Sequence, residues 1–320
     1  MMPESATIPD APLPVSPPSP VRAWLTLVRF AFWRHLRVRQ MVLIAIGLLV
    51  LVGIGLAITT ITTGWTLNER RARGSALTNR NWVKVVEMSQ QAVPFTPAVN
   101  AQLQMTTFVT KGVLDASAFP NFSRWVFGVF LSFLMPVLTL AFAISAIGGE
   151  RESRSLIWQL TRPLPRWSIY LAQVVGVLPW CIGLVLLGFF GLCRVVGPVG
   201  ELAFSLYWPA ILMGTLAFAS LFVLIGSFFR RPAIVALLYA FFIETLIGGL
   251  PGTLKRCSIS FYTRCLLYDA AETQSFSPER STIFNPVSDT FAWLALIAIT
   301  IGVTAIGAIL FARSEFRDDL

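Results

Sequence analysis

Between two long apolar runs, the chain reads GGERESRSLIWQLTRPLPRWS over residues 148–168. This segment, called the island below, begins with alternating charges and continues with apolar residues at helical spacing. The pattern predicts a short amphipathic helix that ends at the prolines Pro163 and Pro165. A helix of about two turns with a proline stop is typical of a surface that another protein binds. The residues expected to form this surface are Glu150, Arg151, Glu152, Arg154, Leu156, Ile157, Trp158, Leu160 and Arg162.

The composition of the chain indicates a membrane protein. Of 320 residues, 55% are hydrophobic and 13% are charged, and the mean hydropathy is +0.71. Soluble domains carry about 25% charged residues, roughly twice as many. The net charge is +9, but the basic residues are distributed among segments that flank the apolar runs. Binding to anionic lipid headgroups explains this distribution better than binding to nucleic acid, which requires a concentrated basic face.

Six apolar runs approach or reach the length of about 20 residues that crosses a bilayer. They cover residues 41–62, 125–147, 169–193, 208–229, 233–250 and 290–312. Pro136 predicts a kink in the second of these spans. Six spans place both termini on one side. The arginines of the short flanking segments favour the cytoplasm for that side, although Arg70, Arg71 and Arg73 conflict with this orientation.

The segments outside the spans have distinct expected structures. Residues 1–20 are rich in proline and serine and predict a disordered tail. Residues 21–40 predict an amphipathic helix in the plane of the headgroups, and an extension of the first span into the cytoplasm is the alternative. Its apolar face is expected to contain Val21, Trp24, Leu25, Val28, Phe32 and Leu36. Two outer loops, 63–124 and 251–289, are too long for simple connections. We expect a small folded cap in the first, and in the second a short helix at 261–271 that dips towards the membrane.

The residues required for common catalytic sites are scarce. His35 is the single histidine, so catalytic triads and histidine-pair metal sites are excluded. The chain has no G-x-x-x-x-G-K-[ST] sequence, so it has no P-loop of its own for ATP. We therefore expect no enzyme activity, no metal and no cofactor in this chain.

Three further residues have two interpretations each. Glu244 lies within the fifth span, where a carboxylate is costly unless it faces protein or water. It either lines a translocation path or lies near the outer interface, because Gly248, Gly249 and Pro251 could end the span early. Cys257 and Cys265 lie in the second outer loop, where they either form a disulfide, if that side is oxidising, or remain thiols.

The order G-E-R-E, S-L-I-W-Q-L and T-R-P-L-P-R-W after an apolar span resembles the permease subunits of ABC-2 type transporters. The N-terminal amphipathic helix, the six spans, the long loop after the first span and the basic C-terminal end agree with that family. Two features depart from it, because the sequence of the outer loop 63–124 is not recognisable as that of the family and the proline-rich tail is not a family feature.

The resemblance implies an all-α, six-span transmembrane domain over residues 41–320. It also implies that the island is a coupling helix, which docks on a separate ABC ATPase subunit that binds ATP and Mg. One subunit would form half of a pathway, as a homodimer or paired with a related permease. The family suggests export and a location in a bacterial cytoplasmic (inner) membrane. Two alternatives remain open, namely a membrane scaffold or signalling protein with partner-binding outer loops, and a secondary transporter that uses Glu244.

Overall fold

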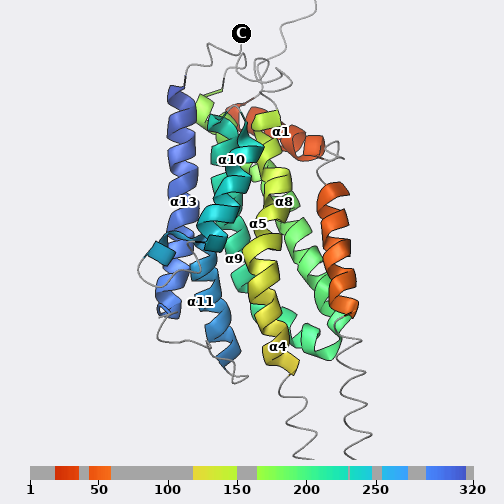
Figure 1. The fold of residues 1–320 in the computed structure, drawn as a ribbon. Helices are drawn as coiled ribbons and strands as arrows, with labels where there is room; N and C mark the ends of the chain where they lie inside the picture. The colour runs from red at the N-terminus through yellow and green to blue at the C-terminus, as the bar shows by residue number, and fades with distance from the viewer. Residues whose placement is uncertain are drawn as a thin grey trace, which may run out of the picture.

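The computed structural model describes residues 19–35, 43–58, 118–149, 164–229, 231–246, 254–272 and 286–314. All elements in these ranges are helices, which pack side by side as a bundle, with α1 lying across one end (Figure 1). The predicted all-α class is therefore confirmed for the described residues. The tail 1–18 and most of the loop 63–124 lie outside these residues.

Four helical segments are long and apolar enough to cross a membrane, namely Phe122–Ala146, Arg166–Val196, Val199–Phe228 and Asp289–Arg313. The first consists of α4 (Ala118–Trp125), the π-helix η1 (Val126–Leu134), α5 (Met135–Ala143) and the 3-10 turn η2 (Ile144–Ala146). The others are α8 (Arg166–Val196), α9 (Pro198–Phe228) and α13 (Asp289–Arg313). These match the second, third, fourth and sixth predicted spans.

The other two predicted spans appear as shorter apolar helices. Leu43–Ile58 falls within the first predicted span. It packs on α8, where Leu49 lies directly over Gly188. Pro232–Glu244 overlaps the first part of the fifth predicted span and consists of α10 (Pro232–Leu238) and the first part of the π-helix η3 (Tyr239–Leu246).

The helix α9 begins well before the predicted start of the fourth span at residue 208. A single residue, Gly197, separates it from α8 and has φ of 81°, in the left-handed region that favours glycine. Pro198 occupies the first turn of α9, where a missing backbone N–H has no cost. The polar residues that interrupt the apolar pattern here lie at the ends of two helices, where Arg194 pairs with Glu201.

A π-helical stretch precedes Pro136. The Met135 N–H donates to the carbonyl oxygen of Phe130, five residues earlier, which is the π-helical pattern. Pro136 has no N–H to continue this pattern, and the α-helical α5 begins at that point. The predicted irregularity of this span is therefore a wide turn on the N-terminal side of the proline.

The segment 21–40, predicted to be an amphipathic helix, is described up to residue 35, where it belongs to the helix α1 (Pro20–His35); residues 36–40 lie outside the described residues. The buried stripe of α1 is Leu27, Ala31 and His35, which faces the bundle. Val21 and Leu25, expected on the apolar face, are exposed. They lie beside the buried stripe on the helix, so α1 presents one apolar strip to protein and a neighbouring one to its surroundings.

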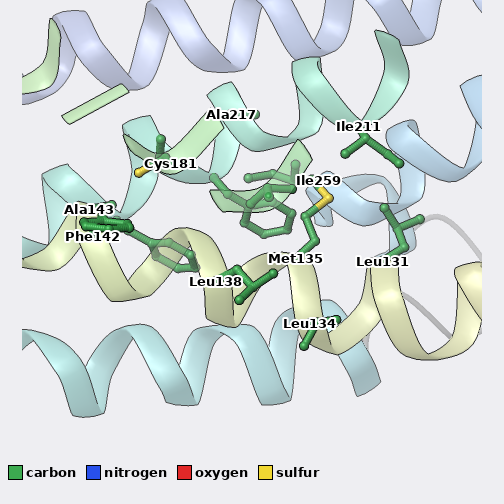
Figure 2. Close-up of a cluster of buried hydrophobic side chains, with 14 of the residues drawn as sticks. Leu131, Leu134, Met135, Leu138, Phe142, Ala143, Cys181, Ile211, Ala217 and Ile259 are labelled. Atoms are coloured by element: carbon green, nitrogen blue, oxygen red, sulfur yellow. The ribbon is translucent and has the colours of Figure 1, made fainter. Parts of the chain in front are cut away.

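The core lies between α5, α8, α9 and α11 (Ile259–Ala271), which converge around the middle of the bundle. Figure 2 shows Met135 pointing towards Ile259 of α11, whereas Leu138 lies beside α8, where an added Cβ on Gly188 would lie 3.6 Å from its Cδ1. Close helix contact depends on a small residue at Gly214, where an added Cβ would lie 2.5 Å from Met135 Cε and 2.7 Å from Thr263 Oγ1.

Part of the predicted outer loop 251–289 belongs to this core. The 3-10 turn η5 (Leu254–Cys257) leads to α11, whose apolar side is almost completely buried against α9, α13 and η1. The expected short helix at 261–271 is therefore confirmed, but it is packed inside the bundle. In the sequence, polar residues such as Ser258 and Ser260 interrupt the apolar pattern before this helix. In the structure, these residues form buried hydrogen bonds.

Candidate functional site

The structure describes the two edges of the island. Residues 150–163 lie outside the described residues, and with them Glu150, Arg151, Glu152, Arg154, Leu156, Ile157, Trp158, Leu160 and Arg162. The preceding chain ends in η2 and Gly149, and the following chain begins at Leu164 and enters α8. The positions of these edges are fixed by contacts with α1.

The helix α1 donates hydrogen bonds to the backbone at both edges of the island. Arg34 Nη2 donates to the carbonyl oxygen of Ala146 at 2.7 Å and to that of Ser145 at 3.4 Å. Trp24 Nε1 donates to the carbonyl oxygen of Ser168 at 2.9 Å. The last carbonyls of a helix lack partners within it and favour a nearby positive charge, which Arg34 supplies. We call these five residues the α1 frame.

A second set of contacts holds α1 on the side of α8. Trp180 Nε1 donates to the carbonyl oxygen of Phe32 at 3.1 Å, and the two rings lie 5.1 Å apart. The backbones approach closely at Gly176, where an added Cβ would lie 2.7 Å from the Cβ of Ala31. The α1 frame therefore rests on a packed helix pair.

Burial controls the charges at the end of α1. Burial, together with the positive charge of Arg34, lowers the pKa of His35 to about 4. Burial also lowers the pKa of Arg34 to about 10. His35 is 1% exposed, and its Nδ1 lies 3.4 Å from Ser145 Oγ. At neutral pH, Arg34 is therefore charged and His35 is neutral.

Glu244 forms a second polar site, in the interior of the bundle. Its side chain is 0% exposed, and its carboxylate accepts four hydrogen bonds, two on each oxygen. Tyr239 Oη (2.8 Å) and the Ile259 N–H (3.0 Å) donate to Oε1. Ser258 Oγ (2.7 Å) and the Ser260 N–H (2.9 Å) donate to Oε2. We call these five residues the Glu244 cluster.

The local sequence explains why the carboxylate binds here. Ser258 is the N-cap of α11, and its hydroxyl accepts from the Phe261 N–H at 3.2 Å. The first backbone N–H groups of a helix have no partner within it and carry a partial positive charge. Glu244 satisfies two of them, so a buried carboxylate is compensated by donors on every side. Both interpretations of Glu244, as part of a translocation path and as a residue near the outer interface, stay predictions.

Arg264 links α11 to the π-helix η1. Its Nη2 donates to Ser132 Oγ, and that hydroxyl in turn donates to the Phe127 carbonyl oxygen. Ser258 and Arg264 were not identified from the sequence. An N-cap serine before an apolar helix, and an arginine within that helix, are the signals that could have indicated them.

The possible disulfide between Cys257 and Cys265 is not formed, since both are free cysteines. Cys257 is exposed at the end of η5, whereas Cys265 is buried on α11. In the part of the chain that the structure describes, no group of His, Cys, Asp or Glu side chains is placed to hold a metal ion.

A family model described as "ABC-2 family transporter protein" matches residues 35–316, which include the island, both its edges and the Glu244 cluster. The chain belongs to the ABC-2 transporter family. This ABC-2 protein is an integral membrane permease component of ABC-type transport. Members of the ABC-2 permease family are not themselves catalytic and normally work with an ABC ATPase partner. No curated protein matches the chain significantly.

Proposed function

We propose that this chain is the permease subunit of an ATP-driven exporter and that the island docks on a separate ATPase subunit. The observation that carries the proposal is the α1 frame, because one helix bonds to the backbone just before the island, at Ala146, and to its last residue, Ser168. A force applied to the island would therefore act on α5, α8 and α1 together.

The proposed docking surface follows from the sequence of the island. Leu156, Ile157, Trp158 and Leu160 supply apolar contact area, and the charged residues before them set the register through ion pairs. Such charges contribute mainly to specificity and to the rate of association. ATP and Mg would be bound by the ATPase, since this chain has no P-loop.

The proposed orientation places both termini in the cytoplasm. Several helix ends gather at the end of the bundle where α1 lies (Figure 1). An added Cβ on Gly148 would lie 3.1 Å from Pro232 Cγ at the start of α10. Arg166 Nη1 donates to the Ser314 carbonyl oxygen at 3.1 Å, which joins the start of α8 to the end of α13. The two described edges of the island, α1 and the C-terminal end of α13 therefore share one side.

The proposed assembly contains two permease chains, as a homodimer or with a related permease, and spans a bacterial cytoplasmic membrane six times per chain. The secondary-transporter alternative requires a carboxylate that exchanges protons during the cycle. The Glu244 carboxylate is buried, and both of its oxygens accept hydrogen bonds from protein groups, which favours a structural role instead.

Replacement of Leu160 by Asp tests the proposal. The charge would be placed in the apolar contact, so we expect the ATPase to be lost from the purified complex while membrane insertion is retained. Val15→Asp, in the N-terminal tail, is the matched control and should leave the complex intact. An unchanged complex with Leu160→Asp would refute docking through the island.

A further inference from the structure

The helices α10, η3 and α11 together follow the course of one interrupted membrane helix. Pro232, at the start of α10, lies at the island end of the bundle beside Gly148. Glu244 lies twelve residues further, about 18 Å along the helix axis at 1.5 Å per residue. Thr263, in the second turn of α11, lies against Gly214 in the middle of α9, and Met135, in the middle of the span Phe122–Ala146, lies against the same glycine.

The helix α11 continues from that depth towards the opposite end of the bundle. Tyr268, near its C-terminus, packs edge-to-face on Phe127, with ring centroids 4.6 Å apart. Phe127 lies near the start of its span, at the end opposite to η2. The N-terminus of α11 therefore meets the end of η3 at the level of Glu244, and the two half-helices lie in sequence through the bundle.

The Glu244 carboxylate is the polar connection between these half-helices. Tyr239 bonds it from η3, while Ser258 and the Ile259 and Ser260 N–H groups bond it from the start of α11. Separation of the half-helices would leave the carboxylate with only the Tyr239 hydroxyl as a donor, and two helix N–H groups without partners, inside an apolar bundle. Since charge-assisted hydrogen bonds strengthen in such surroundings, the joined state is strongly favoured.

We propose that Glu244 is a positioning residue for transport, which makes η3 and α11 move as one unit. Movement at the island is passed through the contact of Gly148 with Pro232 into α10, and through Glu244 into α11 in the opposite half of the bundle. The transport role rests on the proposed function. The connection of η3 and α11 through Glu244, called the joint below, is a property of this chain alone.

The joint is tested by a distance between two spin labels in the full-length protein in lipid nanodiscs. Leu237 on α10 and Asp269 on α11 are exposed and are replaced by labelled cysteines, after Cys257→Ser removes the exposed native thiol. The starting protein should give one narrow distance distribution. Glu244→Gln preserves side-chain size, but an amide nitrogen cannot accept from a backbone N–H. We expect this variant to give a distribution at least about twice as broad.

Tyr239→Phe is the matched control, because it removes one hydroxyl donor and leaves both N–H bonds to the carboxylate. Its distribution should remain narrow. Should Glu244→Gln fail to fold, Ser258→Ala provides the second variant, with an expected intermediate broadening. The joint would be refuted if Glu244→Gln, or Ser258→Ala where it is used instead, gave a distance distribution as narrow as that of the starting protein.

Movement as a unit is tested with the ATPase bound, by comparing the nucleotide-free and vanadate-trapped states. The distance between labels at 237 and 269 should stay constant, while the distance from 269 to a label on exposed Leu187 of α8 should change. A changed 237–269 distance would overturn the coupling. No response of either distance to ATP would contradict the proposed function, while the comparison of variants without ATP would still decide the joint.

Discussion

Acidification should detach α1 from the bundle through protonation of His35. In the docked state, burial and the charge of Arg34 lower the pKa of His35 to about 4. A detached α1 exposes the imidazole, whose pKa returns to its ordinary value of about 6.5. The detached state therefore binds the proton more tightly, and docking is fully stable only above pH 6.5. Stability is lost progressively as the pH falls from about 6.5 towards 4.

The size of this effect follows from the two pKa values. Between pH 7.5 and pH 5, the free energy of docking should fall by about 2 kcal/mol, which corresponds to about a 30-fold change in the docking equilibrium. Arg34 contributes no change in this range, because its pKa of about 10 keeps it charged throughout.

Amide hydrogen exchange over residues 27–35 measures the effect, with protection factors corrected for the intrinsic pH dependence of exchange. The protection factors should fall by about 30-fold between pH 7.5 and pH 5. His35→Asn, which keeps a polar group near Ser145 but does not titrate, should remove most of this fall. Equal losses of protection in the two proteins would refute the assignment to His35.

Two further predictions concern helix packing and topology. Gly307→Val should destabilise the fold by about 1–3 kcal/mol in thermal unfolding, because a Cβ there would overlap the hydroxyl of Tyr170. Gly302→Val is the control and should have little effect, because an added Cβ there has nothing within 4 Å. Equal losses of stability in the two variants would contradict this packing. A cysteine at Ser155 should resist an impermeant thiol reagent applied outside intact cells, whereas rapid labelling there would invert the proposed topology.

Long apolar runs determined much of the fold at the level of sequence. The helices α8 and α13 lie close to the predicted spans, because length and hydropathy are local properties of the chain. The start of α9 was placed too late for the same reason. Arg194 and Glu201 lower the local hydropathy, but their side chains pair across the turn at Gly197. The backbone is helical on both sides of that glycine.

The Glu244 cluster could not be predicted because its hydrogen bonds join two helices, η3 and α11, that are separate in the sequence. Glu244 ends one apolar helix, and its donors Ser258 to Ser260 begin the next. Local patterns indicate only that an intramembrane carboxylate needs a partner. Likewise, helical periodicity identified α1, but the stripe of Leu27, Ala31 and His35 depends on contacts with α8 and η2.

Docking of an ATPase on the island is tested most directly by a photo-crosslinking amino acid at Trp158 in the intact membrane complex. The account predicts a covalent product that contains this chain and a protein with an ATP-binding P-loop, while the same probe at Val15 gives none. An ATPase that co-purifies with the complex but is not crosslinked from Trp158, Leu156 or Leu160 would contradict docking through the island.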